Sequence, residues 1–301
     1  MQQSAEFAAP GVPVTLAPGL QRVLAPNPSA LTGPGTNTYL LGHAALAVID
    51  PGPDDPAHPD ALRAAIAGRP VSHIIVTHAH RDHSALVPAL ARMTGAPVLA
   101  HGPATSGRSA TMTALAAQGL TDSSEGADLT LAPDGLLTEG DRVAGGDWAL
   151  QVMHTPGHMG GHLALVWGEA VFCGDTVMGW ASSLVSPPDG DMGQYMASLT
   201  RLAALGPMVL YPGHGTTVTD PATRIAALTQ HRRAREAAIL AALTPGPATI
   251  AALTAQVYAD TPRALWPAAA RNVLAHLIDL TERNLVAASP ALSPDASFRG
   301  V

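Results

Sequence analysis

Lysine is absent from this sequence of 301 residues, so arginine supplies all 16 of its basic side chains. Aspartate and glutamate together number 23, which gives a formal net charge of -7 at pH 7. An acidic chain disfavours a broad nucleic-acid-binding surface, because such surfaces need clustered cations to neutralise phosphates. The exclusive use of arginine, together with few asparagines, is typical of a GC-rich bacterial genome.

Aromatic residues make up only 4% of the chain and charged residues 13%. The core is therefore expected to consist of alanine, leucine and valine. A single cysteine, Cys173, excludes an intramolecular disulfide framework. Because Cys173 lies inside an apolar run, we expect a small buried side chain and neither a metal ligand nor a nucleophile.

The sequence has no apolar run of about 18 residues, the length that a membrane-spanning helix requires. Residues 1–13 contain no basic segment and no long apolar core, so they do not resemble a signal peptide. We therefore expect a cytoplasmic protein that does not contact a membrane. The chain is long enough for a full catalytic core and a small second domain.

Metal-ligating residue types are concentrated in residues 77–83, Thr-His-Ala-His-Arg-Asp-His, directly after a short apolar run. Three imidazoles and one carboxylate within six positions are typical of a metal site. We expect the turn after a strand to direct His78 and His80 to one ion, and Asp82 and His83 to a second. Short motifs also occur without function, so this interpretation needs ligands from elsewhere in the chain.

Three such residues follow later apolar runs: His158, Asp175 and His214. A Pro-Gly pair precedes both histidines, which suits tight turns at strand ends. Strand ends that meet at one edge of a layered fold would bring all these side chains to one pocket. The set is sufficient for two ions, with His78, His80 and His158 at one, Asp82, His83 and His214 at the other, and Asp175 as a bridge.

Two neighbouring ions favour hydrolysis, because they can share a hydroxide and lower its pKa towards neutrality. We expect that hydroxide to attack the substrate and Asp82 to orient it or accept its proton. Zinc is the expected metal, and histidine and carboxylate ligands also suit iron and manganese. His101, His154 and His162 are expected outside the ligand set, where His162 could orient a ligand through a hydrogen bond.

The ordered set of His78, His80, Asp82, His83, His158, Asp175 and His214 resembles the metallo-β-lactamase superfamily. Residues 35–41 (GTNTYLL) and 48–52 (VIDPG) are similar to the opening strands of that family. The resemblance covers most of the chain. It implies an α/β fold with an αββα sandwich, usually two zinc ions, and the same assignment of ligands to ions.

A change of pattern after Asp220 predicts a domain boundary, with a catalytic domain at residues 1–221 and a helical domain at residues 222–301. The second part resembles the winged-helix extension of one branch of the superfamily, which includes glyoxalase II-like hydrolases and an endoribonuclease. Its apolar stripe needs a partner surface, so we expect it to lie against the catalytic domain. Helical periodicity covers residues 222–243 and 249–258 and a third segment that begins at residue 264 or 268 and ends at 284, and a possible small hairpin follows.

Two segments are expected near the pocket. Residues 109–118 are alanine-rich and helix-prone, and their position after a strand end predicts an insertion at the pocket mouth. Residues 178–192 follow Asp175 and contain a Pro-Pro-Asp-Gly turn. They either shape the substrate cleft or form a plain surface connection.

Two functions remain open. The first is hydrolysis of a small ester, a thioester of the hydroxyacylglutathione kind, a lactone or an amide. The second is cleavage of single-stranded RNA, which would need a basic groove from the metals to Arg232, Arg233 and Arg271. A run such as Arg232, Arg233 and Arg235 on one helix is usually a solvated face, so we favour a small-molecule substrate. The sequence does not indicate an oligomeric state.

Overall fold

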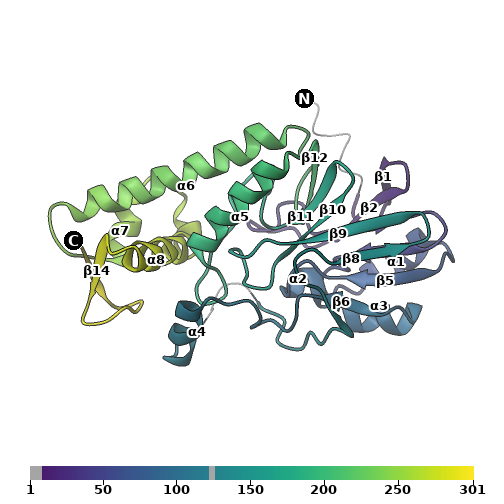
Figure 1. Cartoon of the computed structure of the whole chain (residues 1–301), viewed down its shortest axis with the longest axis horizontal. Helices are drawn as coiled ribbons and strands as arrows, with labels where there is room; N and C mark the ends of the chain where they lie inside the picture. The colour runs from purple at the N-terminus through teal and green to yellow at the C-terminus, as the bar shows by residue number, and fades with distance from the viewer. Residues whose placement is uncertain (1–8, 122–125) are drawn as a thin grey trace.

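Two β-sheets lie face to face in the larger part of the molecule, and helices cover both outer faces (Figure 1). The structure is a computed structural model that describes residues 9–121 and 126–301. Helices α1 (His58–Ile66) and α3 (Val87–Thr94) pack on one sheet, and α5 (Met192–Leu205) packs on the other. The predicted αββα sandwich is confirmed.

The first sheet contains seven strands in chain order. Neighbours among β1 to β4 are antiparallel, whereas β4 to β7 pair in parallel. Parallel pairing brings the carboxyl ends of β4, β5 and β6 to one edge. The strands are β1 (Val14–Ala17), β2 (Leu20–Leu24), β3 (Asn37–Leu41), β4 (Leu46–Ile49), β5 (Val71–Ile75), β6 (Val98–Ala100) and β7 (Gly135–Leu136).

The second sheet contains five strands in the order β12-β11-β10-β9-β8. Strands β8 to β11 form antiparallel pairs, and β12 pairs in parallel with β11. The carboxyl ends of β9, β11 and β12 therefore lie at the same edge. The strands are β8 (Arg142–Gly145), β9 (Trp148–His154), β10 (Leu163–Trp167), β11 (Ala170–Gly174) and β12 (Val209–Pro212).

Residues along the central strands alternate between two parts of the core, one between the sheets and one under the outer helices. They do so because successive side chains on a strand point to opposite faces. Leu41 and Ile49 pack between the sheets against Phe172, while their neighbours Leu40 and Val48 pack under the outer helices. Each sheet is thus buried on both faces, which requires apolar residues at nearly every strand position.

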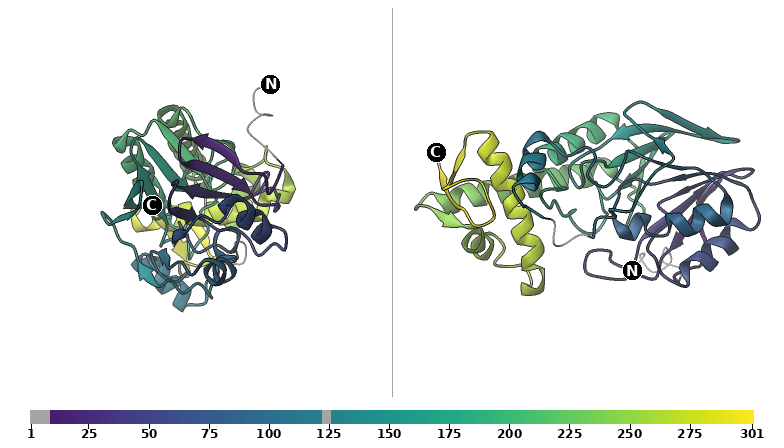
Figure 2. Two further views of the ribbon diagram at one scale, coloured as in Figure 1. Left: turned by 90° about the vertical axis from the view of Figure 1, so that its right-hand side faces the viewer. Right: turned by 90° about the horizontal axis from the view of Figure 1, so that it is seen from below.

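Three helices and a small sheet form the C-terminal part, at the end of the molecule opposite β1 (Figures 1 and 2). A core of its own joins α7 and α8 to the end of α6 and to Phe298. The predicted three helices and hairpin are confirmed. The elements are α6 (Pro221–Leu243), β13 (Ala248–Thr249), α7 (Ile250–Val257), the 3-10 helix η1 (Arg263–Leu265), α8 (Trp266–Glu282), β14 (Val286–Ser289) and β15 (Ser297–Gly300).

Helix α6 connects the two parts. Ile225 and Leu228 near its start pack with α5 and the second sheet, whereas Ile239 and Leu243 near its end belong to the C-terminal core. Ala275 of α8 also packs in the α5 cluster. The C-terminal helices therefore lie against the catalytic part, as expected, and the boundary at residues 221 and 222 stays a prediction.

None of residues 109–118 lines the cavity at the candidate site, so their predicted place at the pocket mouth is wrong. They form helix α4 (Ala110–Ala117), whose Met112 and Leu115 are buried in the C-terminal core. The helix packs there because these two side chains are three positions apart and share one face. This segment thereby links the first half of the chain to its end.

Two expectations from composition can be compared with the structure. Cys173 is fully buried within β11, and burial raises the pKa of its thiol well above the ordinary value. It is the inert small side chain that the sequence predicts. In the described part of the chain, no helix has both the length and the apolar character needed to cross a membrane.

His276 supports a prediction about stability in acid. It is 1% exposed in α8, and neither ring nitrogen has a hydrogen-bond partner among the described residues. Burial, followed by nearby Arg232, lowers its pKa from 6.5 to about 3. The unfolded chain therefore binds the proton first as the pH falls below 6.5, and stability is lost down to the folded-state pKa.

We expect His276→Leu to weaken this loss by about 2 kcal/mol over the two pH units below 6.5. Urea unfolding of both proteins at pH 6.5 and 4.5 measures the difference. His58→Leu is a useful comparison, because burial lowers the pKa of His58 to about 4, which also lies below this pH range, so a loss of similar size is expected there. Equal acid sensitivity in the wild type and in His276→Leu would contradict the assignment.

Candidate metal centre

The segment after β5 carries four of the seven predicted ligand residues. His78 and His80 lie in the extended connection, and a single helical turn, α2 (Arg81–Ser84), holds Asp82 and His83. The sequence predicts a turn here, and the structure forms that turn as one turn of helix. Because β5 lies in the first sheet and β11 and β12 lie in the second, the centre sits at the shared edge of both sheets.

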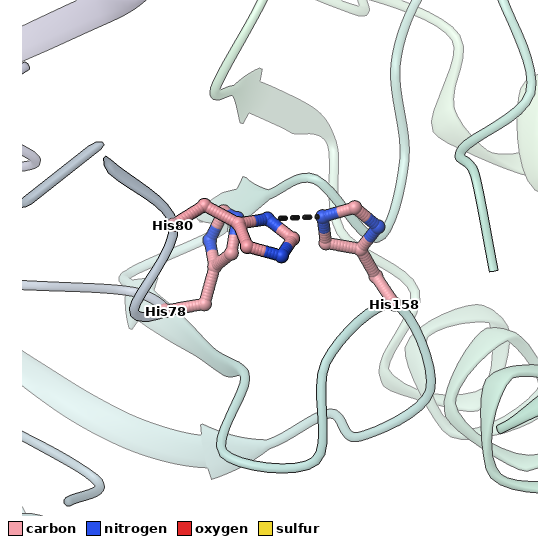
Figure 3. Close-up of side chains that lie close together, drawn as sticks. All are labelled: His78, His80 and His158. Carbon is pink, nitrogen blue, oxygen red and sulfur yellow. Dashed lines mark hydrogen bonds between the residues drawn. The ribbon is translucent and has the colours of Figure 1, made fainter. Parts of the chain in front are cut away.

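The first group of side chains consists of His78, His80 and His158, which lie close together and are all buried (Figure 3). His80 Nδ1 is 3.0 Å from His158 Nε2. The Nε2 atom of His78 has no hydrogen-bond partner among the described residues. Three imidazoles with such an arrangement could supply three nitrogen ligands to a metal ion.

The second group consists of Asp82, His83 and His214. His214 Nε2 is 3.3 Å from His83 Nε2 and 3.2 Å from Asp82 Oδ2. Asp82 is the most exposed member, with 28% of its side chain accessible, whereas the two histidines are buried.

Asp175 faces both groups. Its Oδ2 atom is 3.3 Å from His214 Nε2 and 3.6 Å from the Nε2 atoms of His83 and His158. It is also 4.0 Å from His78 Nε2. The structure thus brings all seven predicted residues together, and their roles as ligands stay predictions.

The donor set fits a cation. His83, His158 and His214 each direct Nδ1 to an oxygen: Asp50 Oδ2 at 3.0 Å, the Leu184 carbonyl at 2.7 Å and the Gly35 carbonyl at 3.1 Å. With the Nδ1 proton donated outward, each Nε2 presents a lone pair towards the centre. Lone pairs and carboxylates that converge within 4 Å repel one another unless a cation or a proton lies between them.

The electrostatics of the centre agree with this reading. Burial opposes protonation of His214, but Asp175 and Asp82 outweigh it and raise its pKa to about 10. Burial and the neighbouring His158 instead lower the pKa of His80 to about 3. Burial would raise the pKa of Asp175, yet His214 and His83 hold it well below the ordinary value. The carboxylates therefore attract positive charge to their side of the centre, and a bound divalent ion would supply that charge.

Asp50 positions this centre and was not singled out from the sequence. Its carboxylate accepts hydrogen bonds from the Thr77 backbone N–H and hydroxyl, each 2.8 Å long, and from His83 Nδ1. A carboxylate behind a metal-ligating histidine fixes the ring and increases its basicity. The available signal was an acidic residue followed by Pro-Gly at the end of an apolar strand.

His162 acts on Asp175, as the sequence suggested it could. Its Nε2 accepts a 3.0 Å hydrogen bond from the Asp175 backbone N–H, and its Nδ1 is 2.9 Å from the Thr155 hydroxyl. Glycine is required at position 174, where φ is 44° and a Cβ would lie 2.5 Å from His162 Nε2. Gly213 is equally constrained, because a Cβ there would collide with Asp175 Oδ1.

The other two histidines lie apart from the seven. His101 and His154 stack on each other with ring centroids 4.5 Å apart. His101 Nδ1 approaches the Leu137 carbonyl, and His154 Nε2 approaches the Gly160 carbonyl. Neither belongs to a group of described residues that could hold a metal ion, and their expected place outside the ligand set stays a prediction.

A cavity of about 460 Å³ opens on the centre and extends to the C-terminal helices. His80, Asp82, His158, Asp175 and His214 line one end. The segment after Asp175 lines the cavity as well, so the first part of residues 178–192 shapes the cleft and is more than a surface connection. Its contributions are Met178, Trp180, Ala181, Ser182 and Leu184.

Arg232 is not part of a solvated face, and the expectation for this arginine is wrong. It is 1% exposed and donates hydrogen bonds to the Ser183 carbonyl and, at 3.0 Å, to Asn272 Oδ1. Asn272 Oδ1 also accepts a 3.1 Å bond from the Val185 backbone N–H. Arg235 is partly buried over the Tyr258 ring, whereas Arg233 is exposed, as predicted.

Comparisons with known proteins agree with the geometry. A family model described as the metallo-beta-lactamase superfamily matches residues 31–214. A second, described as the beta-lactamase associated winged helix domain, matches residues 249–291.

Individual relatives extend over most of the chain. The Drosophila melanogaster protein named beta-lactamase-like protein 2 homolog is 32% identical over 92% of this chain and 92% of its own length. A Burkholderia ambifaria beta-lactamase domain protein of known structure has a TM-score of 0.82 at 25% identity, covering 99% of this chain and 96% of that one. An atrochrysone carboxyl ACP thioesterase from Paecilomyces divaricatus is 32% identical over 76% of this chain and 65% of its own length.

Proposed function

Because the chain belongs to the metallo-β-lactamase superfamily of hydrolases, we propose that it is a dinuclear metal hydrolase of small acyl compounds, with thioesters as the preferred class. The observation that carries this proposal is the place of Asp175. Its carboxylate lies within 4.0 Å of histidines from both groups, as a residue shared by two ions must. The thioesterase name of one relative supports the choice among ester, thioester, lactone and amide.

The residues present would hold one ion with His78, His80 and His158 and the other with Asp82, His83 and His214. Zinc is the proposed metal. Ions held there would polarise a carbonyl and lower the pKa of water, which is the chemistry that acyl hydrolysis needs.

Asp82 is the residue that we propose to orient the attacking water or accept its proton. It lines the cavity and is the one accessible carboxylate of the seven residues. Burial opposes ionisation, but His83 and His214 hold its pKa below the ordinary value, so the carboxylate is ionised at neutral pH. It can therefore orient an attacking water and take its proton.

The cavity suits an acyl chain. Between the centre and the C-terminal helices it is lined by Leu31, Met178, Trp180, Leu184 and Leu265. Apolar walls with a few polar groups are typical of small-molecule sites. The RNA alternative required Arg232 to reach phosphates, and this side chain is buried in a hydrogen-bond network instead.

We expect the purified protein to contain two divalent ions per chain under metal-replete conditions. Elemental analysis after exhaustive dialysis measures the stoichiometry. Chelation should abolish hydrolysis, and Zn²⁺, Fe²⁺ or Mn²⁺ should restore it to different extents, which identifies the preferred metal. A stoichiometry fixed near one would show that the second group does not retain an ion.

A substrate panel tests the reaction class. The panel contains acyl thioesters of N-acetylcysteamine, S-lactoylglutathione, an aryl ester, a lactone, nitrocefin and single-stranded RNA. We expect the highest kcat/KM for a thioester. RNA cleavage with negligible turnover of every acyl compound would overturn the proposed function.

A further inference from the structure

The end of the cavity remote from the metal centre is formed by the C-terminal helices. His231 and Arg235 of α6 and Tyr258 at the end of α7 line it. None of these residues belongs to the seven at the centre. They lie in the same continuous cavity, so one substrate can contact both ends.

The charge of this far end is positive. Apart from Asp82 and Asp175 at the centre, the charged residues that line the cavity are Arg81 and Arg235. No carboxylate among the described residues forms an ion pair with Arg235. The guanidinium keeps its charge at every physiological pH. A partly buried cation without a counter-ion attracts an anion from outside the protein.

Arg235 is also held in place. Its Nη1 donates a hydrogen bond to the Val257 carbonyl, and its guanidinium carbon lies 4.3 Å from the centre of the Tyr258 ring. These contacts use one N–H group and one face of the guanidinium, and they leave other donors available. A cation fixed before binding loses little conformational entropy when a ligand arrives.

Its surroundings add neutral hydrogen-bonding groups to the charge of the guanidinium. Burial lowers the pKa of neighbouring His231, and Arg232, Arg235 and Arg224 lower it further. The Tyr258 hydroxyl is buried and has no hydrogen-bond partner among the described residues. Burial raises the pKa of that hydroxyl, so it remains a donor at neutral pH. Cation, imidazole and hydroxyl at one place are complementary to an oxyanion.

We infer that Arg235, with His231 and Tyr258 beside it, binds an oxyanion carried by the substrate at the end remote from the scissile carbonyl. This inference rests on the proposed function and narrows its substrate class to anionic acyl compounds. The oxyanion is a carboxylate at the end of the acyl chain or a phosphate on the thiol part. Arg235 is then a specificity residue that determines KM.

Two matched pairs of thioesters test the inference. One pair is hexanoyl and adipyl N-acetylcysteamine, which differ by a terminal carboxylate. The other is hexanoyl pantetheine with and without the 4′-phosphate. For one pair, the wild type should prefer the anionic member. Arg235→Met should raise the KM for that anionic thioester about 10- to 100-fold, because one charged hydrogen bond is lost. The value of kcat should stay within about three-fold, and the pair that responds identifies the source of the oxyanion.

Arg233→Met is the matched control, because Arg233 is exposed on the same helix and does not line the cavity. This substitution removes the same charge and should leave KM unchanged for the thioesters of both pairs. Arg235→Lys retains the charge and should keep most of the preference. These two variants show whether the effect of Arg235→Met comes from a lost local contact, from the change in net charge or from a folding defect.

A binding measurement tests the inference without any hydrolysis. Calorimetric titration of the metal-loaded protein with adipate, hexanoate, pantetheine 4′-phosphate and pantetheine should show about 10-fold weaker binding to Arg235→Met for one anionic compound only. If thioesters are not hydrolysed but this selective loss occurs, the subsite stands and the proposed reaction fails. Equal losses for anionic and neutral compounds, or a loss of RNA binding alone, would overturn the inference.

Discussion

Asp175→Ala is expected to lose metal ions and hydrolytic activity together. Among the described residues, Asp175 is the carboxylate that faces both groups, so its removal should affect both proposed ions. We expect the affinity for metal to fall by more than about 100-fold and kcat/KM to fall on the order of 10³-fold. Elemental analysis of the dialysed variant and steady-state kinetics with the best thioester measure the two effects.

Asp191→Ala is a suitable control for this variant. Asp191 is as buried as Asp175, at 6% exposure each, but it caps the first turn of α5 through the Gln194 backbone N–H. We expect Asp191→Ala to lower the free energy of unfolding by about 1 kcal/mol and to leave the metal content unchanged. Asp175→Asn distinguishes charge from shape, because it keeps the size of the side chain. Full retention of two ions in Asp175→Ala would show that this carboxylate is not a bridge.

The sequence was sufficient to find the seven residues that the structure brings together, because they lie in the segments that follow β5, β9, β11 and β12, and strand ends can be predicted from apolar runs. Asp50 was not predicted, because the residues that it contacts are far from it in the sequence. Its role depends on the parallel pairing of Ile49 with Ile75, which sets Asp50 beside Thr77. A single sequence shows the strand and the acidic residue, but not that the two strands are neighbours.

The helices of the C-terminal part were likewise predictable from their periodicity, whereas their contacts were not. Met112 and Leu115 read as a helix face, yet nothing local indicates that their partners are more than 100 residues away. A run of arginines also reads as a solvated face. Burial of one member depends on where α6 crosses the loop at Ser183, 49 residues earlier in the chain.

Because α6 crosses this loop, we also expect Arg232→Met to have a large effect on stability and metal affinity. Arg232 and Asn272 together bind the backbone of Ser183 and Val185, and the Leu184 carbonyl between them accepts the hydrogen bond from His158 Nδ1. The C-terminal helices therefore fix the loop that orients a residue of the first group. Ser183 in turn donates to the Asp175 carbonyl.

We expect Arg232→Met to lower the free energy of unfolding by about 2–4 kcal/mol, because two buried acceptors lose a charged donor. The affinity for one ion, at the first group, should fall about 10- to 100-fold, as is usual when the support of a ligand is lost. Competitive Zn²⁺ titration resolves the two ions, and urea unfolding gives the stability.

A purely structural role for Arg232 predicts a different result. It would lower stability and leave both metal affinities of the folded fraction unchanged. Arg233→Met should be neutral in each measurement, since that side chain is exposed one position along the helix. Arg232→Lys should recover part of the stability, because an ammonium can reach only one of the two acceptors that the planar guanidinium binds together. Selective weakening of the first ion, in a variant changed on a C-terminal helix, would identify that part of the chain as a support of the metal centre.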